Sequence, residues 1–429
     1  SVKYPQILSV NNDIAVAQSG AALLHAGTFN NTVYKGKGVL VGVFDTGNYW
    51  KHPDFRDPND QTKSRILKMW DQTLTPTGAE VPPIGFTYGV EYTQSQINDE
   101  LAGVTTGLVR EADTNGHGTH VAGTAAGNGM ALSSKKYTGM APEADLIIVK
   151  GGASGFSQTN IINSLTYFNN VATALGKPIV VNMSIGGQYS AHDGTGPEED
   201  AVDYFSNSGQ GRVVVIAAGN DNGSNIHAQA TIPAGGTASI PIKVTSNQTT
   251  ATDLFGFLLY GSNNNNITGT ITDLNGNTVS VLADSSTPSS GSALGTGFTF
   301  YADNYVDSSN NKRYLDTYVA RTTGTTLTTV GTWTLSITNN GTTPITVDGW
   351  LYYTNSKFTS TTLSITGGDS NYLIGSPGDA KTAITTASYA GKLTWYSNNT
   401  GTPGGYYNTG ATKTVDGLST YSSFGPLAD

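Results

Sequence analysis

The sequence predicts an α/β protein: a parallel sheet covered by helices on both faces, interrupted by an inserted antiparallel β-sandwich or jelly-roll domain. Before His227, short continuous apolar runs alternate with helical patterns, which is typical of a buried parallel sheet. From about His227 to Thr366 the helical periodicity is replaced by strand-like alternation. The 429 residues contain no internal repeat and fit two or three domains of roughly 150 residues each. We therefore expect an α/β domain from residues 1–227 and 367–429, and a β domain from residues 228–366.

Four β-branched apolar runs are expected to be strands of the parallel sheet: Val39–Phe44, Ala144–Lys150, Pro178–Ser184 and Arg212–Ala218. Between the second and third runs, apolar residues recur at helical spacing from Ile161 to Leu175. Ser157 can cap the start of this helix, and Gly176 can end it. A second helix is expected to start at Pro197, with acidic residues in its first turn.

The middle of the chain has the alternation of half-buried strands, with about eight short strands expected in all. Ala238, Ile240, Ile242 and Val244 show this spacing, as do Trp333, Leu335 and Ile337. The pairs Asn275–Gly276 and Asn340–Gly341 stand between such runs, which predicts two tight hairpins of type I′.

The composition excludes several functional classes. Lys and Arg number 22 against 31 Asp and Glu, a net charge of −9, so the chain has no basic footprint for nucleic acid. With no cysteine, it can use neither thiol chemistry, disulfides nor Cys-ligated zinc. No apolar run approaches the length of a membrane helix. The start at Ser1, without a signal-like segment, and the loop-rich composition lead us to expect a processed, secreted protein.

Asp45 ends the first expected strand, in the sequence VGVFDTG, where α/β sheets place their sites. An acid that merely caps the following turn is the simple alternative. The segment FDTG is also the pattern of aspartic proteases, which need two such carboxylates sharing a proton. No second DTG or DSG occurs in the chain, so that interpretation would require a symmetric dimer.

The segment NGHGTHVAGTAAG, from Asn115 to Gly127, places His117 between two glycines at the expected start of a helix. We interpret Gly116 and Gly118 as keeping bulk away from the imidazole so that a substrate can approach. A metal site is a weak alternative, because the spacing of His117 and His120 is HxxH and no third ligand is evident. His120 is therefore expected to be a structural histidine.

Asn220 ends the fourth expected strand, in the sequence VVVIAAGN. An amide at this point can stabilise a developing oxyanion, although a plain strand-to-loop turn has the same sequence. The segment NMSIGG, from Asn182 to Gly187, ends the third strand with small residues, which suits an extended peptide lying along the backbone.

In their order along the chain, these motifs resemble the subtilisin-like serine proteases, the subtilase family: Asp45 in DTG, HPDF (His52–Phe55), HGTHVAGT, NMSIGG, AAGN and SSFGP. The resemblance covers residues 1–227 and about 367–429. It implies that Asp45 orients the base, His117 is the general base and Asn220 is an oxyanion-hole donor. It also implies that a group of small residues lines the primary specificity pocket: Ser184, Ile185, Gly186, Ala218 and Gly219. Structural calcium and protein or peptide substrates follow from the same resemblance, but no calcium ligands can be named.

One element of the family pattern, the serine nucleophile, is missing. In the family it follows SSFGP in a GTSMA-like motif, and this sequence stops at Asp429. Ser376, Ser422 and Ser423 stand in the wrong context to replace it. Three hypotheses remain: a nicked protease whose companion C-terminal fragment carries the serine, a truncated form of the same enzyme, or a non-catalytic degenerate scaffold that presents the β domain as a binding module.

Overall fold

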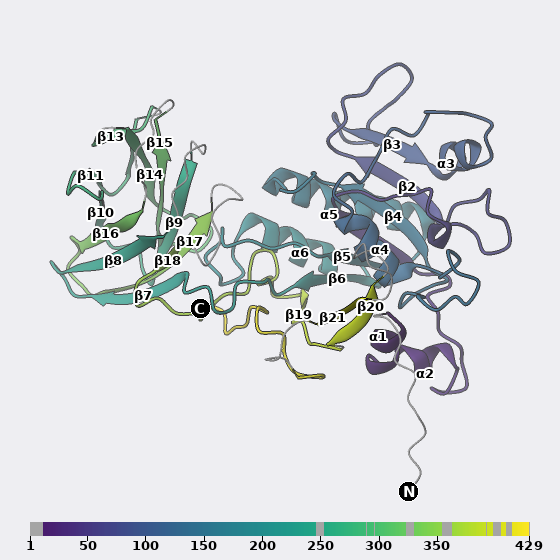
Figure 1. Cartoon of the computed structure of the whole chain (residues 1–429). Helices are drawn as coiled ribbons and strands as arrows, with labels where there is room; N and C mark the ends of the chain where they lie inside the picture. The colour runs from purple at the N-terminus through teal and green to yellow at the C-terminus, as the bar shows by residue number, and fades with distance from the viewer. Residues whose placement is uncertain are drawn as a thin grey trace, which may run out of the picture. The chain divides into compact units, whose positions relative to one another are not determined.

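The computed structural model describes residues 12–245, 253–288, 290–295, 297–322, 330–353, 363–391, 393–397, 405–408 and 414–428. Both chain ends discussed above, Ser1 and Asp429, lie outside the described residues. The chain divides into two compact units, which we call the α/β unit and the β unit (Figure 1). The α/β unit contains Ser1–Ile185, Asp200–Ala217 and Thr382–Ser419, and the β unit contains Gly186–Glu199, Ala218–Lys381 and Thr420–Asp429.

The α/β unit is built on one seven-stranded sheet with the strand order β19-β6-β5-β1-β4-β2-β3. Its neighbouring strands are parallel except for the edge pair β2 and β3. The strands are β1 (Leu40–Asp45), β2 (Ile66–Asp71), β3 (Val90–Thr93), β4 (Asp145–Lys150), β5 (Ile179–Met183), β6 (Arg212–Ala217) and β19 (Ile384–Thr386). A separate antiparallel pair is formed by β20 (Thr394–Ser397) and β21 (Gly405–Asn408). The four expected strands are thus confirmed as β1, β4, β5 and β6.

The described helices are α1 (Asn12–Gln18), α2 (Ala21–His25), the short 3₁₀ helix η1 (Pro53–Phe55), α3 (Gln94–Leu101), α4 (His117–Ala126), α5 (Gln158–Leu175) and α6 (Pro197–Asn207). Two of them cover opposite faces of β1, whose side chains alternate between the faces. Val41 and Val43 share a buried cluster with Ala122 of α4, whereas a Cβ on Gly42 would meet the ring of Phe168 in α5. This α/β arrangement confirms the predicted fold class of the first part of the chain.

The β unit is a sandwich of two antiparallel sheets. One has the order β11-β10-β16-β8-β18, and the other has the order β12-β14-β15-β9-β17-β7 with β13 paired to β14. The strands are β7 (His227–Ile232), β8 (Thr237–Val244), β9 (Asp253–Gly261), β10 (Ile267–Thr272), β11 (Thr278–Val281), β12 (Ser285–Ser286), β13 (Ser292–Leu294), β14 (Phe298–Val306), β15 (Arg313–Arg321), β16 (Gly331–Asn339), β17 (Ile345–Tyr353) and β18 (Leu363–Ile365).

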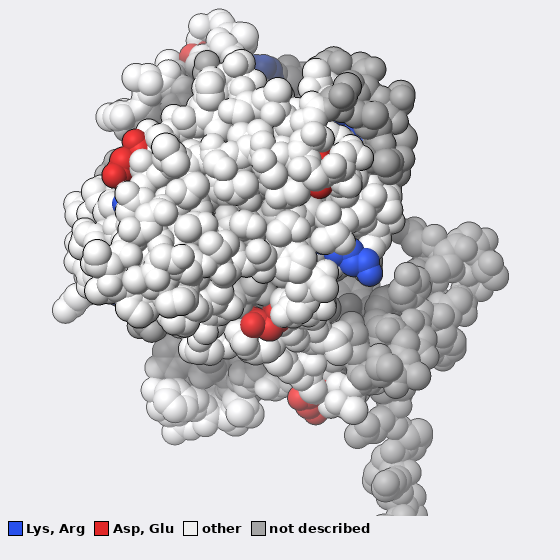
Figure 2. All heavy atoms as spheres, turned by 90° about the vertical axis from the view of Figure 1, so that its left-hand side faces the viewer, with Lys and Arg blue, Asp and Glu red and all other residues white. Residues whose placement is uncertain are grey.

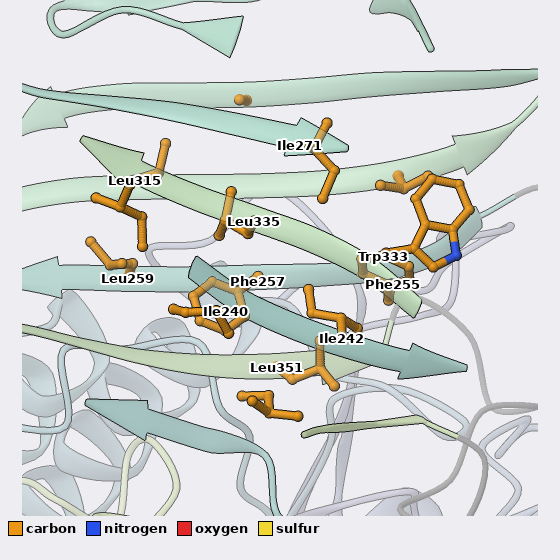
Figure 3. Close-up of a cluster of buried hydrophobic side chains, with 14 of the residues drawn as sticks. Ile240, Ile242, Phe255, Phe257, Leu259, Ile271, Leu315, Trp333, Leu335 and Leu351 are labelled. Atoms are coloured by element: carbon orange, nitrogen blue, oxygen red, sulfur yellow. The ribbon is translucent and has the colours of Figure 1, made fainter. Parts of the chain in front are cut away.

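The core of the sandwich is made by the inward-facing residues of both sheets (Figure 3). Ile240 and Leu335 of one sheet share this core with Phe257 of the other, and each of these residues is at least 96% buried. Trp333 is fully buried and meets Phe255 edge to face, with ring centroids 5.7 Å apart. The alternation predicted at Ala238–Val244 and Trp333–Ile337 is therefore the pattern of two neighbouring core strands, β8 and β16.

Several outward-facing positions of the β8–β16 sheet carry hydroxyl side chains that pair across the strands. Thr237 bonds to Thr338, and Ser239 bonds to Ser336, at 2.9 and 3.2 Å between side-chain oxygens. Figure 2, which looks at the left-hand side of Figure 1, shows a face with only scattered Lys, Arg, Asp and Glu side chains. The low charge of the sequence is therefore visible as a largely uncharged face.

The two predicted hairpins have different outcomes. Asn275 and Gly276 do join an antiparallel pair, β10 and β11. Only Gly276 has a positive φ (86°), so the turn is not of type I′, which needs two such residues. The hairpin predicted at Asn340–Gly341 is wrong, because β16 and β17 belong to different sheets. There the side-chain amide of Asn339 donates to the carbonyl oxygens of Ile232 and Thr343, which stabilises a crossing between sheets.

The β unit is larger than the β domain predicted from sequence, residues 228–366. It also contains Gly186–Glu199 and the residues from Thr420 onward. Lys312 on the loop before β15 pairs with Asp193, with Nζ and Oδ2 2.7 Å apart. His192 stacks on Trp350 of β17 at 4.1 Å between ring centroids. Both contacts join residues more than a hundred positions apart in sequence. None of the described helices is long and apolar enough to cross a membrane.

Candidate active site

Asp45 is the last residue of β1, the strand between β4 and β5 in the middle of the parallel sheet. Its side chain is 1% exposed, and its Oδ1 accepts a hydrogen bond from the backbone N–H of Thr46 at 2.7 Å. Its Oδ2 is buried without a hydrogen-bond partner among the described residues. The strand therefore places a buried carboxylate at the carboxyl edge of the sheet, as the sequence predicts.

His117 is the first residue of α4, and its Nδ1 lies 2.7 Å from Oδ1 of Asp45. A carboxylate oxygen only accepts, so Nδ1 donates the hydrogen and the lone pair of the neutral ring is on Nε2. The histidine side chain is 50% exposed, whereas its carboxylate partner is buried. This is the arrangement of a base whose orientation is fixed on one side and whose other nitrogen can take a proton.

Of the two glycines beside His117, Gly118 has another role than the one proposed from sequence. A Cβ on Gly118 would lie 2.2 Å from the carbonyl oxygen of Gly47 and 3.1 Å from Cβ of Asp45. Gly118 therefore allows α4 to approach the end of β1, and it is buried rather than turned toward a substrate. Gly116 has open space around its Cα. Its φ of 90° lies in the left-handed region, which glycine adopts without steric strain.

Asp113 is a residue beside the site that sequence analysis missed. Its Oδ1 accepts hydrogen bonds from Oγ1 of Thr46 (2.9 Å) and from the backbone N–H groups of Asn115 and Gly116 (3.2 and 2.8 Å). Its Oδ2 accepts two more from Thr119, through the backbone N–H (2.9 Å) and Oγ1 (2.6 Å). Burial alone would raise the pKa of Asp113, but the bonds from Thr119, Gly116 and Thr46 outweigh burial and lower it.

Thr46 completes this connection, because its hydroxyl donates to Asp113 and accepts the backbone N–H of Gly118 at 2.9 Å. The segment that follows Asp45 and the first turn of α4 are thereby joined through one carboxylate. The signal in the sequence was the pattern Asp-Thr-Asn-Gly before His117, in which an Asp can accept the following backbone N–H groups.

Glu111 is a second acid behind the site, with an exposed fraction of 3%. Its Oε1 accepts the backbone N–H of Asn48 at 2.9 Å, and its Oε2 is buried without a partner among the described residues. Burial raises the pKa of Glu111 to about 8, with a smaller contribution from the charge of Asp71. Glu111 is therefore expected to be protonated in the folded protein at neutral pH.

The other predicted site residues fall in two places. Ser184 and Ile185 follow β5 in the α/β unit, and the amide Nδ2 of Asn182 donates to Oγ of Ser184 at 3.0 Å. Gly186, Ala218, Gly219 and Asn220 belong to the β unit.

In the β unit, the carbonyl oxygen of Ala218 accepts the N–H of Gly375 at 3.2 Å, and that of Gly219 accepts the N–H of Ser423 at 3.0 Å. Gly219 has a φ of 107°, which favours glycine. Asn220 and Gly186 are exposed. Ser423 is 1% exposed, and its Oγ accepts the N–H of Asp221 at 3.0 Å, which agrees with its rejection as a nucleophile.

His120, expected to be a structural histidine, is not buried. It is exposed on α4 and lines a pocket of about 500 Å³ together with His52 and Asp54. In the part of the chain that the structure describes, no three His, Asp or Glu side chains form a group that could hold a metal ion. No calcium ligands are therefore assigned.

Comparison with known proteins bears on this geometry directly. The model of the subtilase family (Peptidase_S8) matches residues 36–429. The chain belongs to the subtilase family. Among curated relatives, it is 30% identical over 191 residues to the subtilisin of Bacillus sp. strain TA39. It is 33% identical over 190 residues to the major intracellular serine protease of Bacillus subtilis strain 168.

Each of these two matches covers 44% of this subtilase, and they cover 35% and 44% of the respective relatives. The chain thus spans less than half the length of the curated relatives it matches. One similar solved structure is that of the CspB protease of Clostridium perfringens. The match covers 96% of this chain and 76% of the CspB chain, with a TM-score of 0.69. At 19% identity that likeness shows the fold alone.

Proposed function

We propose that this subtilase is a secreted serine endopeptidase that hydrolyses peptide bonds by acyl transfer. The observation that carries the proposal is the 2.7 Å contact between buried Asp45 and half-exposed His117, on the two motifs where the family places its acid and base. Asp45 holds the ring with Nδ1 protonated, so Nε2 takes the proton of the attacking hydroxyl and later returns it to the leaving amine.

The remaining roles in the proposal come from the family resemblance. Asn220 donates its amide to the oxyanion, and the small residues Ser184, Ile185, Gly186, Ala218 and Gly219 line the primary specificity pocket. Structural calcium is part of the same proposal. Its test is the thermal midpoint of unfolding with and without a calcium chelator, where an unchanged midpoint would contradict it.

Because no GTSMA-like motif follows SSFGP in this sequence, the proposal places the serine nucleophile outside the 429 residues. In the proposal it lies either on a continuation of this chain or on a companion fragment that remains bound. A mass spectrum of the natural protein under denaturing conditions separates these cases, since a companion fragment gives a second polypeptide. A fluorophosphonate probe then identifies which polypeptide carries the reactive serine.

The decisive variant is His117→Ala, made in the natural protein with its serine segment present. We expect kcat for a chromogenic peptide to fall by at least about 10³-fold, because the base is lost. His120→Ala, three residues along the same helix and exposed, is the matched control and should retain most of the activity. Asn220→Ala should lower kcat by about 10²–10³-fold, the loss that removal of such a donor causes in a related subtilisin.

Two outcomes would contradict the proposal. Activity retained in purified His117→Ala would remove the histidine from the role of base. No fluorophosphonate labelling of the natural protein would favour the alternative, a degenerate scaffold that presents the β unit as a binding module.

A further inference from the structure

The β unit contains a pocket of about 290 Å³ that the proposed proteolysis does not use. Its wall is formed by side chains of the β7–β17–β9 sheet and of two loops, among them Gln229, Tyr260, Lys312, Asp348, Trp350 and Tyr372. The volume is at the small end for ligand sites, which suits a single small unit rather than a peptide segment.

The charged groups of the pocket already have partners. Oδ1 of Asp348 lies 3.2 Å from Nε2 of His227 and accepts the amide N–H of Gln229 at 2.9 Å. Nζ of Lys312 lies 2.7 Å from Oδ2 of Asp193. An anionic ligand would therefore meet no unpaired cation in the pocket, and its lost hydration energy would not be compensated by an ion pair. The pocket therefore favours a ligand without negative charge.

The same side chains still offer hydrogen-bonding atoms. Both contacts of Asp348 use Oδ1, so within the described part of the chain its Oδ2 remains available as an acceptor. Lys312 keeps N–H donors beyond the one directed at Asp193, and Gln229 keeps its amide oxygen. Donors and acceptors that stand together match vicinal hydroxyl groups, each of which both donates and accepts.

Two partly buried tyrosines, Tyr260 and Tyr372, supply the accessible aromatic surface of the pocket. Beneath them Trp350 is fully buried and stacks on His192, with 20° between the ring planes. Nε1 of Trp350 donates to the carbonyl oxygen of Tyr372 at 2.9 Å, which fixes the backbone of that tyrosine. A tyrosine on a fixed backbone can cover the C–H face of a sugar ring with little loss of conformational freedom on binding.

Backbone strain is concentrated at the same place. Tyr372 and His192 have φ values of 52° and 54°, in the left-handed region that bulky residues rarely adopt. Tyr372 lines the pocket, and its ring also packs edge to face on fully buried His227 at 5.2 Å. Strained residues of this kind persist where the surrounding structure fixes them and are common at ligand sites.

We propose that this pocket binds one neutral sugar unit of a glycan, a hexose or an N-acetylhexosamine. Asp348, Gln229 and Lys312 bind the hydroxyl groups, and the rings of Tyr260 and Tyr372 contact the apolar face of the sugar. This binding is independent of peptide-bond hydrolysis and would hold the protein on glycan-bearing material.

The test is titration of the natural protein with glucose, galactose, mannose and N-acetylglucosamine, each followed by isothermal calorimetry. At least one sugar should bind saturably with a Kd on the order of 1 mM, as expected for so small a site. Ser262 is exposed and lines the pocket, so Ser262→Phe should fill it and abolish binding, whereas Ser262→Ala should bind within about twofold of the natural protein.

Gln229→Leu provides a second variant, which removes the amide at similar volume and should weaken binding at least about fivefold. Thr334→Val, on the outward face of the other sheet, is its control and should change nothing. The proposal is overturned if none of the four sugars binds saturably. It is equally overturned if binding persists unchanged in Ser262→Phe, since the sugar would then lie elsewhere. Neither result depends on whether the protein cleaves peptides.

Discussion

At the scale of single residues, the carboxylate of Asp113 connects the segment after Asp45 to the first turn of α4, which begins with His117. Asp113→Ala removes these bonds together. We expect kcat to fall about 10- to 100-fold through misplacement of the histidine, with little change in KM, and the free energy of unfolding to fall by about 2–3 kcal/mol. Steady-state kinetics and urea unfolding measure the two effects.

Thr114→Ala is the matched control, because Thr114 is the exposed neighbour of Asp113. If kcat of Asp113→Ala stays within twofold of this control, Asp113 does not position the site. Because the pKa of Asp113 is lowered in the folded protein, its contribution to the free energy of unfolding depends on pH. Its contribution to stability is present above its unfolded value of about 3.8 and is lost as pH falls below that value.

Asp45 and His117 could be predicted from the sequence. Asp45 ends a strand, His117 begins a helix, and each lies in a recognisable motif. Sequence analysis did not find Asp113 or Glu111, because their roles depend on which backbone N–H groups a folded loop presents to them. The role of Gly118 was misjudged for a similar reason. A glycine next to a histidine can make room for a ligand or for another backbone, and only the position of Gly47 decides between the two.

At the scale of elements, helix α5 begins and ends where its sequence predicts. Oγ of Ser157 accepts the N–H of Asn160 at 3.2 Å, and Gly176 ends the helix with a left-handed φ of 63°. Ser157→Ala should therefore lower the free energy of unfolding by about 1 kcal/mol, and Gly176→Ala by about 1–2 kcal/mol. Thr166→Ala, exposed in the middle of the same helix, should not destabilise. Urea midpoints of the three variants check this, and equal midpoints would contradict it.

The hairpins show where local signals stop being sufficient. Asn275–Gly276 and Asn340–Gly341 carry the same dipeptide between alternating strands, yet only the first joins paired strands. At the second position the side chain of Asn339 bonds to Ile232, on a strand far away in sequence, and stabilises the connection between the sheets. A dipeptide favours a turn, but the sheet to which the next strand belongs is decided by core packing.

At the scale of the whole molecule, the sequence predicted two kinds of fold but did not show that Gly186–Glu199 groups with the β unit. This segment lies between two elements of the parallel sheet in the chain, and its composition resembles an ordinary loop. Its placement rests on pairs such as His192 with Trp350 and Asp193 with Lys312, which no local pattern reveals.

The stability of the molecule should also depend on pH in a direction set by its buried acids. Burial raises the pKa of Glu111 in the α/β unit to about 8. In the β unit, burial raises the pKa of Glu199 and of Asp379, and the charge of Asp379 adds to the rise for Glu199. Between about pH 4.5 and 8 the folded state therefore holds protons that the unfolded chain releases, so stability falls as pH rises through this window. The net charge of −9 acts in the same direction.

Glu111→Gln tests this account, because glutamine keeps an oxygen for the N–H of Asn48 but cannot ionise. The variant should match the natural protein near pH 5 and be more stable by on the order of 3–5 kcal/mol near pH 9, since each pKa unit corresponds to about 1.4 kcal/mol. Glu143→Gln is the control: Glu143 is 49% exposed, and its replacement should leave the pH profile unchanged. Urea unfolding at a series of pH values measures both. A profile for Glu111→Gln parallel to that of the natural protein would show that Glu111 is ionised in the fold and that another group causes the slope.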